Sequence, residues 1–288
     1  MTADAVLDTS RIDYLLDTAE LARAKVVLVG LGSGGAAVMQ RLAMCGIRDW
    51  TLFDPDVLQP ENLVKHPARR TDLGRLKTDI AAEWLADRNP ASHVTAFPHD
   101  IRKSKDIEQA IAEATLVVCA VDNALARNFL NELCVRSRTP CVFGMVFRTG
   151  MGGEVYAYLP GETGCHDCKL AFCMDRGIDL DDWLELTSEE QQRIYGLGEP
   201  DFAASGLAAD IAIVASYHAH YVVSLLGGRH SRYLLQPSFN WLTIGIRRTE
   251  GLFENSYDNT RVLLRPLTGC HLRCGTGTES AEPTSAGG

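Results

Sequence analysis

The chain has 288 residues, 46% of them hydrophobic and 23% charged, and its formal net charge is -9 at pH 7. This length and apolar content support a sizeable core and predict one large α/β domain or two small ones. The acidic balance argues against a nucleic-acid partner, because binding to a phosphate backbone depends on clustered Lys and Arg. The N-terminus lacks the pattern of a signal peptide, and the longest apolar helix, at about residues 208–226, carries Asp210, His218 and His220. We therefore expect a cytoplasmic protein with no membrane segment.

The first half of the chain alternates between strand and helix patterns. Residues 10–22 are amphipathic, and residues 25–30 form a short apolar run typical of a buried parallel strand. This alternation continues and predicts a Rossmann-like, doubly wound and mostly parallel sheet. Further strands are expected at residues 50–54, 93–97, 115–121 and 140–144, and helices at residues 35–45, 76–88, 106–113 and 123–136.

The pattern changes after residue 153. Strand-like segments at residues 154–159, 233–236 and 242–248 predict that antiparallel strands continue the sheet. Residues 175–205 between them are polar and acidic, which is typical of a long excursion with short helices.

We expect a single domain over residues 1–274. Its nucleotide-binding half covers about residues 24–150, and its second half covers about residues 151–274. Residues 275–288 consist mostly of Gly, Thr, Ser, Ala, Pro and Glu, a composition that predicts a disordered tail.

A glycine-rich turn, Gly30-Leu-Gly-Ser-Gly-Gly35, follows the first strand and opens a helix. In this context Gly30, Gly32 and Gly35 permit a tight turn and the close approach of backbone N–H groups to a phosphate. Asp54 ends the second strand, where an acidic side chain can bind ribose hydroxyls. The combination predicts a nucleotide site, and the alternative is a tight turn without a ligand.

Amide and ammonium groups follow Asp54 in the chain, namely Asn62, Lys65 and Lys77. Such groups just beyond a ribose site suit the phosphates of a nucleoside triphosphate. Single lysines are usually solvated surface residues, but two near a phosphate loop favour a binding role.

The chain contains nine cysteines, an odd number, and several lie in apolar contexts, so disulfides do not explain them together. The spacing of two separate pairs falls within the range of closed four-thiolate zinc sites, and four ordinary thiols are the alternative. Such a site would be structural, because four thiolates leave no open position for catalysis. The expected zinc ligands are Cys165, Cys168, Cys270 and Cys274, and the expected core thiols are Cys45, Cys119, Cys134 and Cys141.

Together these features resemble the ThiF/MoeB/HesA adenylyltransferases, relatives of the ubiquitin-activating enzymes, over roughly residues 7–274. The resemblance implies that the glycine loop and Asp54 hold ATP, that Asn62 and Lys77 contact its phosphates, and that Asp56, Lys65 and Arg127 belong to the same nucleotide site. It also implies that Asp122 helps to hold Mg²⁺. The motifs that carry it are the glycine loop, Asp54-Pro-Asp56, Glu61-Asn62-Leu63, Gly74-x-x-Lys77, Asn89-Pro90, Asp122-Asn-Ala-Leu-Ala-Arg127 and both cysteine pairs.

The chain departs from the family pattern in two places. Lys65 stands where the family usually has arginine, so a point charge replaces a forked guanidinium in phosphate contact. The second cysteine pair, Cys270-His-Leu-Arg-Cys274, has one residue more than the usual spacing. This leaves His271 as an alternative to one of the thiolates.

The resemblance implies adenylation of a C-terminal carboxylate, usually the Gly-Gly end of a ubiquitin-like or sulfur-carrier protein. Asp122 with Mg²⁺, Lys77 and Lys65 would offset the negative charge that builds up during the transfer. Some family members then pass the acyl group to a cysteine. Cys173 is the only cysteine between the two pairs, with Lys169 and Arg176 nearby to lower its pKa; a buried core cysteine is the alternative.

Other hypotheses remain open. One is adenylation of a short peptide or a tRNA-bound carboxylate without a thioester step. Another is an NAD-dependent oxidoreductase, which would share the glycine loop but would not explain Asn62, Lys77 or the cysteine pairs.

The family also favours a homodimer in which Arg11 reaches the partner's ATP, although an ordinary surface arginine is the alternative. His218 and His220 do not share a helix face and are expected in core or surface positions. Gly287-Gly288 fits a flexible tail, with self-activation as the alternative.

Overall fold

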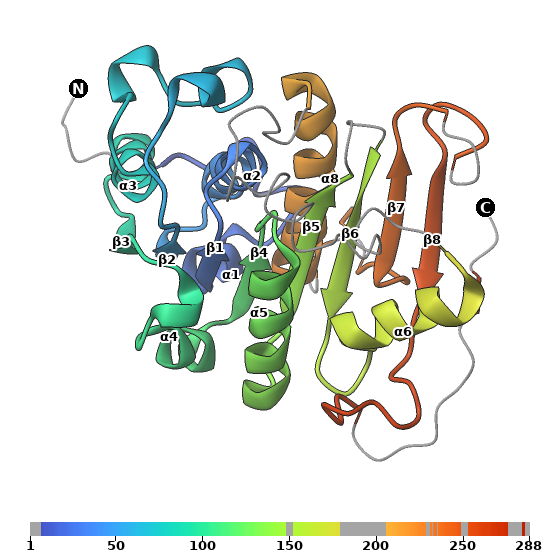
Figure 1. Ribbon diagram of the computed structural model, residues 1–288. Helices are drawn as coiled ribbons and strands as arrows, with labels where there is room; N and C mark the ends of the chain where they lie inside the picture. The colour runs from blue at the N-terminus through green and yellow to red at the C-terminus, as the bar shows by residue number, and fades with distance from the viewer. Residues whose placement is uncertain are drawn as a thin grey trace.

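In the part of the chain that the structure describes, the strands form one nine-stranded sheet, covered by helices on both faces (Figure 1). The strand order is β3-β2-β1-β4-β5-β6-β7-β8-β9. The predicted mixed sheet, mostly parallel and continued by antiparallel strands, is therefore confirmed. The computed structural model describes residues 7–147, 152–178, 206–228, 231, 233–234, 236–248, 253–275 and 284–285.

The first half contains five strands that pair in parallel. The strands are β1 (Lys25–Val29), β2 (Asp49–Phe53), β3 (His93–Phe97), β4 (Leu116–Cys119) and β5 (Cys141–Val146). The helices are α1 (Thr18–Arg23), α2 (Ser33–Met44), α3 (Lys77–Arg88), α4 (Ile107–Glu113) and α5 (Ala124–Ser137), with short 3₁₀ turns η1 (Pro60–Val64), η2 (Arg70–Asp72) and η3 (Ile101–Lys103).

The second half adds antiparallel strands to the free edge of β5. The strands are β6 (Gly152–Tyr158), β7 (Trp241–Gly245), β8 (Asn259–Leu263) and β9 (Thr284–Ser285), and the helices are α6 (His166–Arg176) and α8 (Ala208–Gly227).

The strand predicted at residues 233–236 is wrong for the residues that the structure describes there. The backbone N–H groups of Tyr233 and Leu234 donate to the Ser231 hydroxyl at 3.1 and 2.8 Å, which bends the chain instead of extending it. The Gln236 amide donates to carbonyl groups near the end of α8. Local side-chain hydrogen bonds thus take the backbone donors that a strand would need.

Three other predicted features lie wholly or largely outside the described residues. These are residues 179–205 of the acidic excursion, most of the C-terminal tail and Gly287-Gly288. Within the tail, Thr284–Ser285 pairs with β8.

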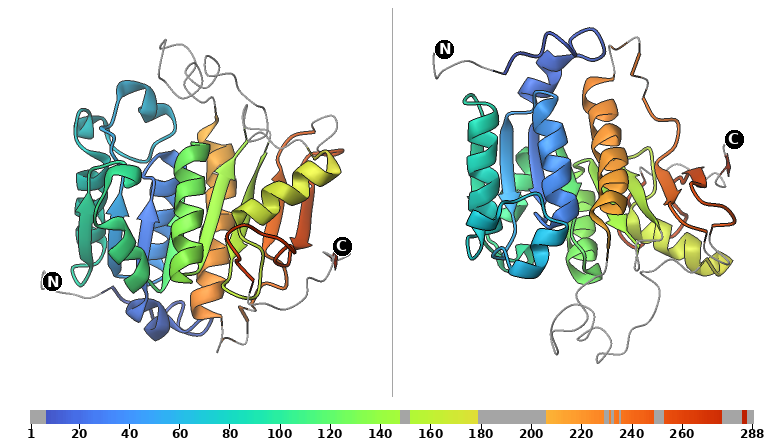
Figure 2. Two further views of the ribbon diagram at one scale, coloured as in Figure 1. Left: turned by 60° about the horizontal axis from the view of Figure 1, so that its bottom comes forward. Right: turned by 90° about the horizontal axis from the view of Figure 1, so that it is seen from above.

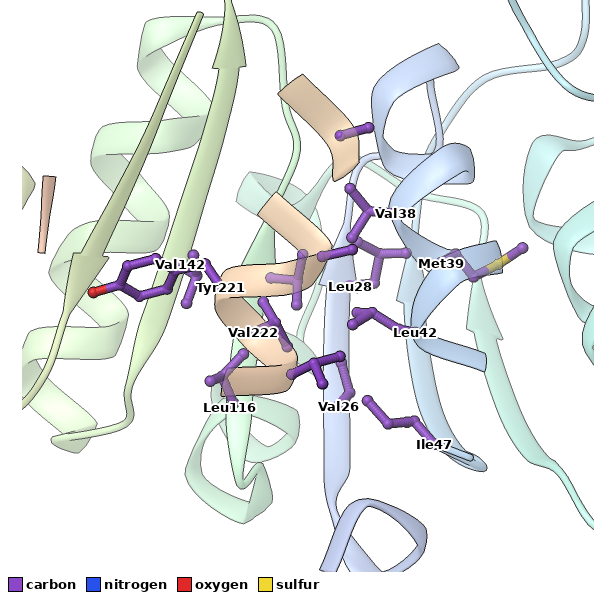
Figure 3. Close-up of a cluster of buried hydrophobic side chains, with 14 of the residues drawn as sticks. Val26, Leu28, Val38, Met39, Leu42, Ile47, Leu116, Val142, Tyr221 and Val222 are labelled. Carbon is purple, nitrogen blue, oxygen red and sulfur yellow. The ribbon is translucent and has the colours of Figure 1, made fainter. Parts of the chain in front are cut away.

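Alternate residues of the central strands pack into two separate cores, one on each face of the sheet. On one face, Val26 and Leu28 of β1 pack among apolar side chains of α2 and α8 (Figure 3). On the other face, Val27 and Val29 pack in a cluster that includes residues of α4, α5 and α6. Viewed from above, α2 and α8 lie side by side on one face, and α5 and α6 lie on the opposite face (Figure 2). Two apolar faces explain why the parallel strands are apolar at nearly every position.

Helix α8 is 20 residues long with a mean hydropathy of 1.2, and by length and composition alone it could span a membrane. It packs instead against α2 and against strands β5 and β6. Tyr221 and Val222 of α8 lie in the core cluster (Figure 3). Its placement identifies it as a core helix.

Candidate active site

The predicted nucleotide-binding residues gather where the strand order reverses. Strand β1 lies between β2 and β4, so the connections after β1 and after β4 leave in opposite directions. The carboxyl ends of these parallel strands lie at one edge of the sheet (Figure 1). Gly30, Asp54 and Asp122 follow the carboxyl ends of β1, β2 and β4 in the chain. Open α/β sheets bind ligands in the crevice at this position.

The three motif glycines have different roles in the turn. Gly30 has a positive φ of +92°, and a Cβ there would lie 2.6 Å from the Ala120 carbonyl oxygen. A Cβ on Gly35 would lie 1.9 Å from the Gly30 carbonyl oxygen. Among the residues that the structure describes, a Cβ on Gly32, which caps α2, would meet nothing within 4 Å. Gly30 and Gly35 therefore allow the backbone to pack closely, whereas Gly32 faces open space through which a phosphate could approach.

Asp54 braces the glycine loop. Its Oδ2 accepts a hydrogen bond from the Leu31 N–H at 2.6 Å, and its Oδ1 accepts one from the Asp56 N–H at 2.9 Å. Burial raises the pKa of this carboxyl, and the charge of Lys77 and the two backbone donors oppose the shift. The side chain that was predicted to bind ribose thus also fixes two loops of the site.

Lys77 begins α3 and reaches back to the segment that follows β2. Its Nζ lies 2.7 Å from Asp56 Oδ2, and its side chain is 9% exposed whereas that of Asp56 is 61% exposed. Because one partner is exposed, this ion pair contributes little to stability. Its effect is to hold the Lys77 ammonium group close to the carboxyl ends of β1 and β2.

Asn62 and Lys65 lie in the same segment, within and at the end of η1. The Asn62 Oδ1 accepts a hydrogen bond from the Gln59 N–H at 3.0 Å, which fixes its side chain at the start of the 3₁₀ turn. Lys65 is half-buried and, with Arg41 of α2, lines a hollow of about 360 Å³ between this segment, α2 and the start of α8. The segment and α2 therefore each contribute one cationic side chain to a hollow that Ser33 of the glycine loop also lines.

Asp122 is exposed just after β4, and Asn123 caps α5 by accepting a hydrogen bond from the Ala126 N–H at 2.8 Å. Arg127 is 2% exposed, and its guanidinium donates to the Val121 carbonyl at 3.1 Å. This burial favours a supporting role for Arg127 beneath the Asp122 loop over the direct nucleotide contact expected from the motif.

The four expected zinc ligands meet at one point. All four Sγ atoms lie within 4.8 Å of one another. The Cys165 Sγ lies 3.9 Å from the Cys168 Sγ and 3.7 Å from the Cys270 Sγ. The Sγ atoms of Cys168 and Cys274 are 3.5 Å apart. A tetrahedral zinc with Zn–S bonds of about 2.3 Å separates its sulfur ligands by roughly 3.8 Å. The distances therefore fit zinc and are too long for disulfides.

The backbone of the loop between Cys270 and Cys274 accommodates the extra residue of the second cysteine pair. Arg273 adopts a left-handed φ of +51°, which returns the chain to bring Cys274 into the cluster. His271 does not replace a thiolate: it is exposed, and its Nε2 lies 3.3 Å from Asp167 Oδ2. The four cysteines are thus the ligand set that fits the metal.

Cys173 is fully buried on α6, and burial raises the pKa of its thiol to about 12. The two cations expected to activate it have other partners. Lys169 pairs with Glu154, and the Arg176 guanidinium lies 3.9 Å from the centre of the Phe172 ring. A thiolate nucleophile needs exposure and a lowered pKa, so this placement favours the interpretation of Cys173 as a core residue.

The positions of the remaining candidates follow from burial. His218 is buried and its Nε2 bonds to the Val142 carbonyl at 3.1 Å, whereas His220 is exposed. This confirms that the two histidines lie on different faces of α8. Arg11 is exposed near the N-terminus.

Two features were missed by sequence reasoning. His66 is 8% exposed and contacts the glycine loop. Its sequence signal was its place next to Lys65, in the segment that is expected to contact phosphates. The ion pair between Glu154 and Lys169 is buried between β6 and α6, where Trp241 donates to the Glu154 carboxylate at 2.8 Å. In the sequence, Glu154 and Lys169 are single charged residues in apolar segments, and nothing in the pattern indicates that they pair.

Comparisons with known proteins agree with this geometry. Molybdopterin-synthase adenylyltransferase of Salmonella typhimurium is 33% identical over 164 residues, which cover 54% of this chain and 65% of that protein. Ubiquitin-like modifier-activating enzyme 5 of Arabidopsis thaliana is 28% identical over 169 residues, which cover 54% of this chain and 39% of that protein. The matches span less than two thirds of the length of either relative.

Solved structures support the fold. E. coli MccB in complex with ATP superposes with a TM-score of 0.67 at 23% identity, covering 90% of this chain and 68% of that chain. The microcin C7 biosynthetic enzyme MccB in complex with N-formylated MccA gives a TM-score of 0.70 at 23% identity, covering 90% and 69% of the two chains. The model of the ThiF family matches residues 9–250, which is most of the chain. The chain therefore belongs to the ThiF family.

Proposed function

We propose that this protein is an ATP- and Mg²⁺-dependent adenylyltransferase that acts on the C-terminal carboxylate of a ubiquitin-like or sulfur-carrier protein ending in Gly-Gly. The observation that carries the proposal is the convergence of the glycine loop, the Lys77–Asp56 pair and Asp122 at the reversal point of the sheet. The names of the relatives, an adenylyltransferase and an activating enzyme, support the same activity.

In the proposed reaction, a carboxylate oxygen of the carrier attacks the α-phosphorus of ATP. A C–O–P anhydride bond forms, the bond between the α-phosphorus and its bridging oxygen breaks, and pyrophosphate leaves with the electron pair. The attacking carboxylate is already ionised at neutral pH, so the site needs no general base. Its contribution is positioning and charge neutralisation.

Each residue has a place in this scheme. The glycine loop and Asp54 hold the nucleotide, with Asn62, Lys65 and Lys77 at its phosphates. Asp122 offers the carboxylate oxygen that Mg²⁺ prefers, and the ion would offset phosphate charge during the transfer. We assign Arg127 to support of the Asp122 loop because its guanidinium is buried against Val121.

We further propose that the reaction ends at the acyl-adenylate, without a thioester on Cys173, because this thiol is buried and its pKa is raised. A homodimer with Arg11 at the partner's site, and a cytoplasmic location, remain further proposals. Adenylation of a short peptide carboxylate is the second candidate, and it requires the same site without a thioester.

A pyrophosphate-exchange assay tests the proposal. With a candidate carrier ending in Gly-Gly, we expect carrier-dependent exchange between labelled pyrophosphate and ATP, reduced at least about 100-fold by Lys77→Ala or Asp122→Asn. Exchange that depends on a short peptide and not on any carrier would favour the second candidate. Binding of a nicotinamide dinucleotide without exchange under any condition would sink the adenylyltransferase assignment.

The fate of the adenylate needs a separate experiment. We expect Cys173→Ala to retain exchange and to give the same products as the unsubstituted chain. A reductant-sensitive adduct between enzyme and carrier on a non-reducing gel, lost in Cys173→Ala, would contradict the proposed end point.

A further inference from the structure

The backbone on both sides of Leu31 is held by side chains from outside the glycine loop. The Leu31 N–H donates to Asp54 Oδ2 at 2.6 Å, and the Leu31 carbonyl oxygen lies 2.9 Å from His66 Nε2. Leu31, Asp54 and His66 are 1%, 5% and 8% exposed, so water does not compete for these contacts. Two successive peptide planes of the loop are therefore fixed.

The tautomer of His66 follows from its second contact. Its Nδ1 accepts a hydrogen bond from the Ala68 N–H at 3.1 Å, so the ring proton resides on Nε2, which donates to Leu31. Burial lowers the pKa of His66 and the charge of Lys77 lowers it further, whereas the hydrogen bond with Leu31 and the charge of Asp72 oppose the shift. The ring is neutral at neutral pH, and both nitrogens are engaged, which leaves no free lone pair for proton transfer.

The Leu31 carbonyl shares its peptide plane with the Gly32 N–H, and in a trans peptide these two groups point in opposite directions. Fixing the carbonyl toward His66 therefore turns the Gly32 N–H away from His66. In the part of the chain that the structure describes, the first backbone bond of α2 is donated by Ala36 to the Gly32 carbonyl, at 2.9 Å. The Gly32 N–H takes no part in that bond, and a Cβ built on Gly32 would meet no described atom within 4 Å.

We propose that His66 is a positioning residue for nucleotide binding: by holding the Leu31 carbonyl, it aims the Gly32 N–H at a phosphate of the nucleotide. The inference rests on the proposed ATP site. His66 links two parts of that site, because its backbone N–H donates to the Asn62 backbone carbonyl at 2.7 Å and Lys65 precedes it in the chain. The segment that carries the phosphate-binding side chains thus also sets the geometry of the loop.

Two substitutions separate the two contacts of the ring. In His66→Asn, the amide oxygen takes the place of Nδ1 and can still accept from the Ala68 N–H, but no donor reaches Leu31. In His66→Gln, the longer side chain places an N–H donor near the position of Nε2 and keeps the contact with Leu31. Each variant loses one buried hydrogen bond, so their thermal unfolding midpoints are expected to fall by similar amounts.

The experiment measures the dissociation constant for ATP by calorimetry with the full-length protein, together with KM and kcat in the exchange assay. We expect His66→Asn to weaken ATP binding about 5- to 10-fold, which corresponds to one net hydrogen bond, and to raise KM more than it lowers kcat. His66→Gln is expected to stay within about threefold of the unsubstituted chain. His93→Asn, the same substitution at an exposed position on β3, is the control.

The outcomes separate the two proposals. Equal ATP affinity in His66→Asn and the unsubstituted chain, or equal weakening in both His66 variants, would overturn the positioning role and leave the adenylyltransferase proposal in place. Failure of the unsubstituted chain to bind ATP would overturn both.

Discussion

At the scale of single residues, the motif glycines show what a sequence can and cannot specify. The pattern Gly30-Leu-Gly-Ser-Gly-Gly35 predicted the turn and its place between strand and helix. It could not separate the glycines by role, because that depends on Ala120, the residue after β4, and on the path of the loop. It likewise gave no reason to expect that Asp54 and His66 would hold Leu31 from two sides.

The different roles of Gly32 and Gly35 lead to opposite predictions for the same substitution. Gly35→Ala is expected to lower the free energy of unfolding by about 3 kcal/mol or more, because its Cβ would overlap backbone that cannot move away. Gly32→Ala is expected to cost at most about 1 kcal/mol, since alanine is a poorer N-cap than glycine but its Cβ meets no described residue. Chemical denaturation of both variants measures these costs.

The same pair tests the route of phosphate approach. We expect Gly32→Ala to weaken ATP binding at least about 10-fold despite its near-native stability, because the new methyl group occupies the open space before the loop. Unchanged ATP affinity in Gly32→Ala would show that the nucleotide does not approach the loop from this side.

At the scale of elements, the predictions succeeded where the pattern was set locally. The strand at residues 93–97 and the helices that became α3 and α5 lie within one residue of their expected ends, because apolar periodicity and end signals coincide there. Strand β8 was missed because Asn259, Thr260 and Arg261 are exposed and carry no apolar alternation. Its pairing with β7 is decided by tertiary contacts that a polar segment does not reveal.

The cysteine cluster joins two elements that are far apart in the chain, the start of α6 and the loop at residues 270–274. We expect one zinc ion per chain by elemental analysis. Cys274→Ser is expected to lose the metal and to lower the unfolding temperature by more than about 5 °C, because the binding energy of structural zinc contributes to folding. Cys173→Ser, a change of the same type outside the cluster, should keep one zinc. Full zinc occupancy in Cys274→Ser would contradict the four-cysteine ligand set.

At the scale of the whole molecule, α8 joins the parallel and antiparallel halves of the sheet, since it packs against both β5 and β6. Its His218 lies directly over β5, where a Cβ on Gly144 would come within 2.1 Å of the ring Nδ1. The sequence predicted a core helix and a histidine without metal-binding geometry. It could not predict that the ring would fill the space left by a glycine on a strand, since this match depends on the packing of the two elements.

This placement makes global stability depend on pH. Burial lowers the pKa of His218 from 6.5 to about 4, so between these values the unfolded chain binds a proton that the folded chain excludes. Stability is then fully present above about pH 6.5 and is lost as pH falls toward 4. For these two pKa values, the loss between pH 7.5 and pH 5 is about 2 kcal/mol.

Other buried histidines, such as His66 and His166, also have lowered pKa values, so the His218 contribution must be isolated by comparison. His218→Gln keeps an N–H donor for the Val142 carbonyl but does not titrate, and denaturation of both proteins at pH 7.5 and pH 5 gives the difference. We expect the unsubstituted chain to lose about 2 kcal/mol more than His218→Gln over this interval. Equal losses would mean that His218 is protonated in the folded state, which would require α8 to separate from β5 enough to admit water to the ring.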